Sequence, residues 1–133
     1  MNLYLDTNVF LDAILLRKLS AAPLGIIDAC KAGSLTGFTS SIRIANLTYI
    51  LREHDKRFTK MIVQDLLSFI KISDLSAQDM SGAFELPFAD REDAFQYVAA
   101  MNVPQLSAII TRNVKDFKSS TVRVMKPEDW LAQ

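Results

Sequence analysis

Short apolar segments alternate with longer segments of helical periodicity along this chain, and that alternation limits its possible folds more than any other feature. The strand-like segments are residues 2–5, 35–39, 69–72, 108–111 and 121–125. Strands that are separated by helices in this way form a parallel sheet whose two faces are covered by helices. The sequence therefore predicts an α/β fold, with ligand sites beyond the carboxyl ends of the strands.

Helices are expected between these strands and after the last of them. Their expected bounds are residues 9–19, 23–32, 42–53, 58–70, 76–88, 90–101 and 127–131. Thr7 or Asn8 is a suitable N-cap for the first helix, and Ser40 or Ser41 for the third. Gly33 is suited to ending the second helix.

Length and composition favour a single domain that spans residues 1–133. Hydrophobic residues make up 50% of the chain and charged residues 23%, which excludes intrinsic disorder. Fifteen basic and fifteen acidic side chains cancel, so binding of nucleic acid would need a local basic patch. The lone Cys30 and lone His54 exclude a disulfide framework and zinc sites built on either residue type. No apolar run approaches the ~20 residues of a membrane span, so we expect a cytoplasmic protein.

Aspartates occur at three places that a parallel sheet would bring to one edge. Asp6 follows the first strand, and Asp116 follows the fourth. Asp90 and Asp93 open a helix with a spacing that puts both on one face. Each alone can be explained as a helix cap or turn residue. Together they would repel one another unless a cation is bound, and oxygen ligands favour Mg²⁺ or Mn²⁺.

Other familiar catalytic patterns are missing from the sequence. It contains no glycine-rich phosphate loop, no nucleophile elbow and no dinucleotide-binding motif. The aspartates are therefore the only candidate for chemistry, and from the residues alone the inference stops at a divalent-metal site.

Three segments resemble the signatures of PIN-domain proteins, in the order in which that family carries them. They are LDTNVFLD from Leu5 to Asp12, DREDA from Asp90 to Ala94, and TRNVKDF from Thr111 to Phe117. The resemblance implies a three-layer α/β/α fold around a central parallel sheet of four to five strands. It also implies an acidic pocket that holds Mg²⁺ or Mn²⁺ and hydrolyses RNA phosphodiester bonds. Many small members are VapC-type toxins paired with an antitoxin, and the family also suggests a homodimer.

The resemblance carries site residues over to matching positions. Asp6, Asp93 and Asp116 would be metal ligands, and Asp90 would be an accessory catalytic acid. The residues expected to line the pocket or meet substrate are Thr7, Asn8, Thr111, Arg112 and Asn113. The planar guanidinium of Arg112 is suited to a phosphate.

One position departs from the family pattern. The family usually has a glutamate on the helix after the second strand, whereas this chain has Asn46 there. Asn46 can still coordinate a cation through its carbonyl oxygen, or hold a water bound to the cation, but it removes one negative charge. A PIN-like subgroup resembles this chain in having asparagine at this position. The substitution still puts a mechanism with two metal ions in doubt.

Basic and aromatic residues outside these motifs have simpler explanations. Four cations, Arg52, Lys56, Arg57 and Lys60, form a local cluster that is more simply a solvated helix face than a phosphate track. The pair Arg17 and Lys18 is similarly ambiguous. The aromatic residues expected to be core or helix-packing residues are Tyr49, Phe58, Phe69, Phe84, Phe95, Tyr97 and Trp130.

Two other functions compete with the ribonuclease. Asn46 and the neutral net charge also suit a catalytically weak PIN-like module that binds RNA or protein. An aspartate after the first strand also occurs in dehalogenase-like phosphatases and receiver domains. The sequence argues against this third possibility, because dehalogenase-like enzymes need a second aspartate where Asn8 stands.

Overall fold

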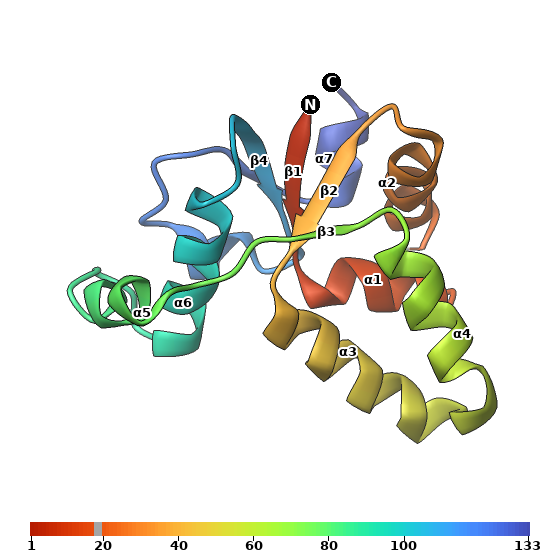
Figure 1. Ribbon diagram of the computed structural model, residues 1–133. Coiled ribbons are helices and arrows are strands. Elements are labelled where there is room, and N and C mark those ends of the chain that lie inside the picture. Colours follow the sequence, from red (N-terminus) through yellow and green to blue (C-terminus); the bar gives the residue numbers. More distant parts are fainter. Residues whose placement is uncertain (18–19) are drawn as a thin grey trace.

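A five-stranded parallel sheet forms the centre of the protein in the computed structural model, which describes residues 1–17 and 20–133 (Figure 1). The strands are β1 (Asn2–Leu5), β2 (Thr36–Thr39), β3 (Lys71–Ile72), β4 (Leu106–Ile110) and β5 (Val124–Met125). They lie in the order β3-β2-β1-β4-β5, and every neighbouring pair is parallel. The predicted parallel sheet of four to five strands is confirmed.

The helices connect these strands and continue beyond the last one. They are α1 (Thr7–Ile14), α2 (Ala21–Ala32), α3 (Ser41–His54), α4 (Lys56–Leu67), α5 (Ala77–Ala83), α6 (Arg91–Met101) and α7 (Pro127–Leu131), with a short 3-10 helix η1 (Val114–Phe117). No helix among these described residues is long and apolar enough to cross a membrane.

Local signals placed several helix ends correctly. Ser40 caps α3 by accepting a hydrogen bond from the Arg43 N–H, and Gly33 ends α2 in the left-handed conformation at φ 85°. The expected N-cap of the first helix was wrong, because Asp6 holds that place and accepts a hydrogen bond from the Thr7 N–H. The chain turns directly after β1, so Thr7 already lies inside the helix.

Helices α1 and α5 are several residues shorter than their periodicity predicted. Helix α1 ends at Ile14, and Leu16 takes a positive φ of 48°, which breaks the helical path. The expected end at residue 19 lies outside the described residues, as does Lys18 of the Arg17–Lys18 pair. Helix α5 ends at Ala83, five residues before the expected end at Phe88, because the chain turns ahead of Pro87.

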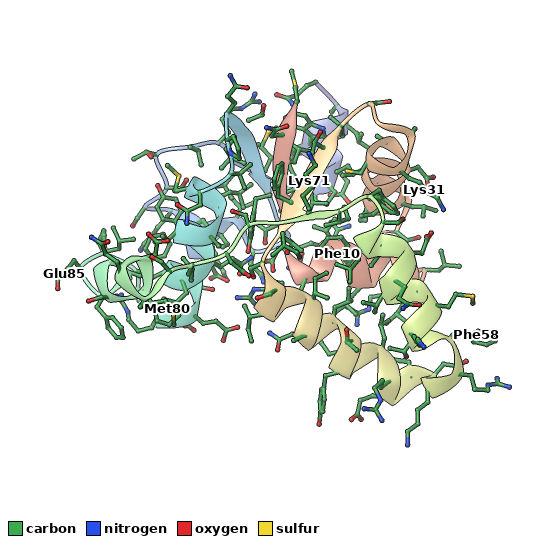
Figure 2. The ribbon with its side chains drawn as sticks, viewed as in Figure 1. Phe10, Lys31, Phe58, Lys71, Met80 and Glu85 are labelled. Atoms are coloured by element: carbon green, nitrogen blue, oxygen red, sulfur yellow. The ribbon has the colours of Figure 1, made fainter. Side chains whose placement is uncertain are left out.

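Alternate residues of the central strands supply two separate cores, one on each face of the sheet. Leu3 and Leu5 pack into the core formed with α1, α2, α3, α4 and α7. Tyr4, between them, packs into the other core with α5, α6 and η1. Figure 2 shows Phe10, which is 1% exposed, inside the first core. This alternation is what a strand buried on both faces produces, and it gives the three layers.

The strand order creates one place where polar loops can meet. From β1 the chain passes through α1 and α2 to β2 on one side, and it later returns through α5 and α6 to β4 on the other side. The segments that follow β1 and β4 therefore leave the same edge of the sheet and diverge. In open α/β sheets this divergence opens the crevice where ligands bind.

Candidate active site

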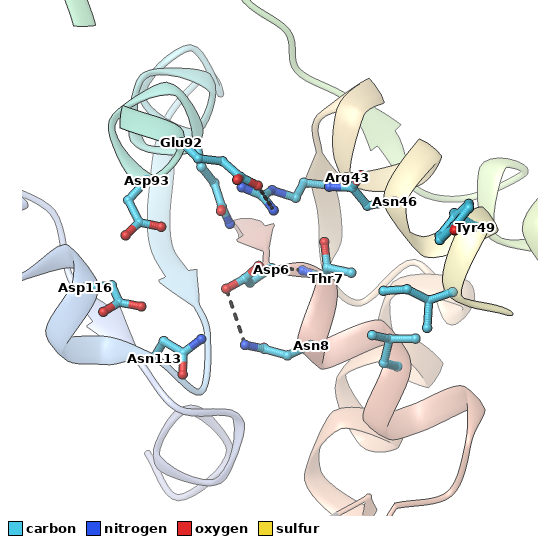
Figure 3. A pocket seen from close by; sticks show the side chains of 13 residues that line it. Asp6, Thr7, Asn8, Arg43, Asn46, Tyr49, Glu92, Asp93, Asn113 and Asp116 are labelled. Carbon is cyan, nitrogen blue, oxygen red and sulfur yellow. Dashed lines mark hydrogen bonds and ion pairs between the residues drawn. The ribbon is translucent and has the colours of Figure 1, made fainter. Parts of the chain in front are cut away.

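A polar cavity of about 450 Å³ lies beyond the carboxyl ends of β1 and β4 (Figure 3). One wall comes from α3 and the other from α6 and η1, with Asp6 and the start of α1 at the base. The lining residues are Asp6, Thr7, Asn8, Leu11, Arg43, Asn46, Tyr49, Ile50, Glu92, Asp93, Gln96, Asn113 and Asp116. Most of the residues that the sequence predicted for a site are brought together here.

Asp6 is the most firmly held carboxylate of the cavity. It is 8% exposed, and its Oδ1 accepts a hydrogen bond of 2.7 Å from the Thr7 backbone N–H. The hydroxyl of Thr111 donates to its Oδ2 at 2.7 Å, and the Asn8 amide donates to the same oxygen at 3.4 Å. These three hydrogen bonds fix the position of the Asp6 carboxyl group at the base of the cavity.

Thr111 holds residues of the site in place through hydrogen bonds. It is completely buried and does not line the cavity. Besides donating to Asp6, its hydroxyl oxygen accepts a hydrogen bond of 3.0 Å from the Asn113 backbone N–H. The predicted pocket residue Thr111 therefore connects the loop after β4 to the carboxylate after β1.

Asp93 and Asp116 face the cavity from the opposite wall. Asp93 lies in the first turn of α6, and Asp116 lies in η1. Burial raises the pKa of Asp93 to about 6, and the negative charges of Asp116 and Asp90 add to the rise. The positive charge of Arg43 partly offsets that rise. Asp93 is thus a carboxylate whose charge is opposed by its surroundings, and a cation would relieve this.

The donor set suits a hydrated divalent cation. Asp6, Asp93 and Asp116 offer only oxygen, the ligand type that Mg²⁺ and Mn²⁺ prefer. Among the described residues, no three Asp, Glu, His or Cys side chains are grouped closely enough to hold a metal ion between them. Mg²⁺ usually keeps several waters and binds through one or two carboxylates, so this spacing fits a cation held partly through water.

Asn46 lines the cavity on the α3 wall, as the sequence predicted. Arg43 stands one turn before it, and the Arg43 Nη1 forms an ion pair of 3.0 Å with Glu92 Oε1 across the two walls (Figure 3). This wall therefore carries an amide and a cation, where the family usually has an acid.

Besides the apolar Leu11 and Ile50, four lining residues were not predicted from the sequence: Arg43, Glu92, Gln96 and Tyr49. Gln96 is 4% exposed, and its Nε2 has no hydrogen-bond partner among the described residues. Helical spacing could have indicated three of them, because residues three apart share a helix face. Arg43 and Tyr49 lie three residues either side of Asn46, and Gln96 lies three after Asp93. The expectation that Tyr49 is a core or helix-packing residue was wrong, since the residue is 70% exposed.

Besides Thr111, two predicted site residues lie outside the cavity lining. Asp90 is exposed and caps α6, accepting a hydrogen bond of 2.7 Å from the Glu92 N–H. Its carboxylate reaches the site only through its electrostatic effect on Asp93. The guanidinium of Arg112 pairs with the buried Asp12 and, at 2.8 Å, with Glu128. Arg112 therefore connects α1 to α7, while its backbone N–H donates to the Asn8 side chain at 3.3 Å.

Comparison with known proteins identifies the family of this chain. No curated protein sequence matches it at a significant level. The fold is similar to a chain in the crystal structure of VapBC2 from Rickettsia felis bound to a DNA fragment from their promoter, with a TM-score of 0.69. The two are 23% identical, and the match covers 95% of this chain and 98% of that chain. A family model described as PIN domain matches residues 2–115. The chain belongs to the PIN-domain family.

Proposed function

We propose that this protein is a divalent-metal-dependent endoribonuclease that hydrolyses RNA phosphodiester bonds. One observation carries the proposal: carboxylates from three separate segments, after β1, on α6 and in η1, line a single polar cavity. Burial first, and then the repulsion of neighbouring carboxylates, raises the pKa of Asp93 to about 6, so keeping the charged form of Asp93 in this cavity costs free energy. A functional cation explains why the arrangement exists.

The side chains have distinct roles under this proposal. Asp6, Asp93 and Asp116 would hold Mg²⁺ or Mn²⁺ partly through bound water, and Asn46 would contribute through its carbonyl oxygen or a bridging water. When bound, the cation would supply Lewis acidity at the phosphate and a more acidic water. Asp93 lines the cavity, and it or its neighbour Asp90 would relay the proton of the attacking water, directly or through a second water. Asp90 would in either case act as an accessory acid beside Asp93.

Other cavity residues would position the substrate. The hydroxyl of Thr7 is buried and has no hydrogen-bond partner among the described residues, so it can donate to a phosphate oxygen or a water. Asn8 and Asn113 present amides at the base of the cavity (Figure 3). Arg43 brings a positive charge to the wall where Asn46 stands, which favours a phosphate there.

We propose further that the chain acts as the toxin of a toxin–antitoxin pair and forms a homodimer, with all of residues 1–133 in a single domain. The chain with a similar fold comes from a VapBC2 assembly on promoter DNA, which supports a partner protein for this chain. Co-expression with the product of an adjacent small gene, followed by co-purification, would test the partner.

A nuclease assay tests the proposed activity directly. The purified protein would be incubated with labelled RNAs, including structured tRNA, with Mg²⁺, with Mn²⁺ and with EDTA. Asp93→Asn, prepared in the same way, should lose most activity because it removes a carboxylate from the cavity. The control Asp28→Asn changes an exposed aspartate of α2 that lines no part of the site, and it should cut like the unaltered protein.

A second candidate function follows from Asn46. A neutral side chain on the α3 wall also suits a weakly catalytic module that binds RNA or protein without turnover. Binding of RNA without cutting of any RNA, with or without metal, would favour the module. Cutting that is metal-dependent and lost in Asp93→Asn would exclude it.

A further inference from the structure

An exposed aromatic side chain separates the acidic cavity from a basic region of the same helix. Tyr49 lines the acidic cavity and also a second cavity of about 440 Å³, whose other lining residues are Arg52, Glu53 and Lys56. Figure 3 shows Tyr49 on α3, on the side of the cavity away from Asp93 and Asp116. With 70% of its side chain exposed, the ring is free to stack against a ligand.

The basic region continues between α3 and α4. A third cavity of about 320 Å³ is lined by Thr48, Arg52, Lys56, Thr59, Lys60, Val63 and Gln64. Arg52 and Lys56 line both basic cavities, so the two adjoin at these side chains. The three cavities thus form one path along α3, from the carboxylates past Tyr49 to the corner between α3 and α4.

The three cations that line this path, Arg52, Lys56 and Lys60, are not paired with acidic side chains among the described residues. Their neighbour Arg57, by contrast, is paired with Asp55 at 3.6 Å and lines neither cavity. In a chain of zero net charge, unpaired cations that share cavities beside an acidic site indicate an anionic ligand.

We propose that this path binds single-stranded RNA beside the cut site, with a base stacked on Tyr49 and phosphates held by Arg52, Lys56 and Lys60. The position of the cut rests on the proposed function, but binding along the path does not. From Asn46 to Arg52, both on α3, the path extends about 9 Å at the rise of a helix, which exceeds the length of one nucleotide. Stacking on an aromatic ring requires an unpaired base, so a single strand fits and a duplex does not.

Binding can be measured without any cutting. The unaltered protein and its variants would be titrated in EDTA against a fluorescein-labelled single-stranded RNA of mixed sequence, with fluorescence anisotropy as the readout. Tyr49→Ala should weaken binding about 10-fold through loss of one stacked base, whereas Tyr49→Phe should keep most of the affinity. Lys56→Gln should reduce the slope of log K against log salt by about 0.7, the value for one phosphate contact on a single strand.

The chain offers a matched control at the same corner. Arg57→Gln removes a nearby positive charge that lines neither cavity, so affinity and salt slope should stay as in the unaltered protein. All four changes are at exposed side chains, and unchanged melting temperatures would show that the fold is intact. Duplex RNA of the same sequence should bind more weakly than the single strand.

Any one of three results would overturn the inference. The protein fails to bind single-stranded RNA, Tyr49→Ala binds it as tightly as the unaltered protein, or Arg57→Gln loses as much affinity as Lys56→Gln. Failure of the proposed function looks different, because binding would then depend on Tyr49 and Lys56 while no RNA is cut in Mg²⁺ or Mn²⁺. If cutting occurs but Tyr49→Ala and Lys56→Gln bind and cut normally, the nuclease stands and this path does not.

Discussion

Single side chains of the candidate active site are held in different ways, as Asp6 and Asp93 show. Asp6 is fixed in place by hydrogen bonds from Thr7, Asn8 and Thr111. Burial raises the pKa of Asp93 to about 6, and the negative charges of three neighbouring carboxylates add to the rise. The cavity therefore combines a carboxyl group fixed by hydrogen bonds with one that takes up a proton more readily than an ordinary aspartate.

The raised pKa of Asp93 predicts how stability depends on pH in metal-free protein. A folded-state pKa of about 6 exceeds the unfolded value of roughly 4, so the folded state binds the proton more tightly. The resulting stabilisation is fully present below about pH 4 and is lost as the pH rises through 6. Melting curves in EDTA should show this loss in the unaltered protein.

Asp93→Asn is the matched comparison for that measurement. The variant has no carboxylate to titrate, so its melting temperature should change less between pH 4 and pH 7. The difference in melting temperature, variant minus unaltered protein, should be larger at pH 8 than at pH 4. The variant is nevertheless expected to be inactive. Parallel melting profiles for the two proteins would contradict the assignment of the pKa to Asp93.

Asn46 offers a second test at the residue scale. Asn46→Asp adds a negative charge to the cavity and should tighten Mn²⁺ binding, because cation affinity rises with the number of charged ligands. Isothermal titration calorimetry would measure this, with Gln64→Glu on α4 as a control that adds the same charge outside this cavity. Equal Mn²⁺ affinities in all three proteins would place Asn46 away from the bound cation.

Among the elements, β2 and α3 together position the α3 wall of the site. Strand β2 is paired with β1 and β3, and Ser40 starts α3 immediately after it. Gly37 lies in the middle of β2, where a Cβ would come within 2.8 Å of Ile70 Cδ1 and 2.9 Å of Cys30 Sγ. The close packing of the first core against β2 therefore requires a glycine there.

Gly37→Ala should destabilise the protein by about 1–3 kcal/mol, the usual cost of overpacking a core. Chemical denaturation would measure the loss. Gly82→Ala is a suitable control, since a Cβ on Gly82 has no neighbour within 4 Å in α5. That control should be neutral or slightly stabilising, because alanine favours a helix over glycine by roughly 0.5–1 kcal/mol. Equal stability of both variants would mean that β2 shifts to accept the methyl group.

On the scale of the whole molecule, Arg112 joins segments from both ends of the chain. Its guanidinium pairs with the buried Asp12 of α1 and with Glu128 of α7, and α7 lies beyond the residues that match the family model. Arg112→Met should cost about 3–5 kcal/mol of stability, as expected when a buried charge loses its partner. Arg17 lies 3.6 Å from Asp12 and should keep the loss near the lower end of that range.

Glu128→Gln is the matched control, because the Glu128 side chain is 42% exposed and its loss should cost less than about 1 kcal/mol. The same variants test the predicted phosphate contact of Arg112. A loss of stability in Arg112→Met with unchanged KM for RNA would make its role structural. A higher KM with unchanged stability would support the phosphate contact instead.

The general architecture and the meeting of the three aspartates were predictable from the sequence. Helical and strand periodicity are local properties, and a parallel sheet brings whatever follows its central strands to one edge. Asp6 and Asp116 follow β1 and β4, and Asp93 opens the helix that leads into β4, so their gathering needed only the order of the elements. Even the start of α7 at Pro127 follows from a local signal, a proline in the first turn.

Only the tertiary structure decided how side chains from distant segments share the space around that edge. The Arg43–Glu92 ion pair, the exposure of Tyr49 and the pairing of Arg112 with Asp12 across 100 residues all depend on distances between helices. Those distances are set by the packing of both cores against the sheet, and no local pattern encodes them. Sequence periodicity and the order of the elements thus determined the parallel sheet and the edge at which the site lies. Packing determined which polar groups line the cavity there.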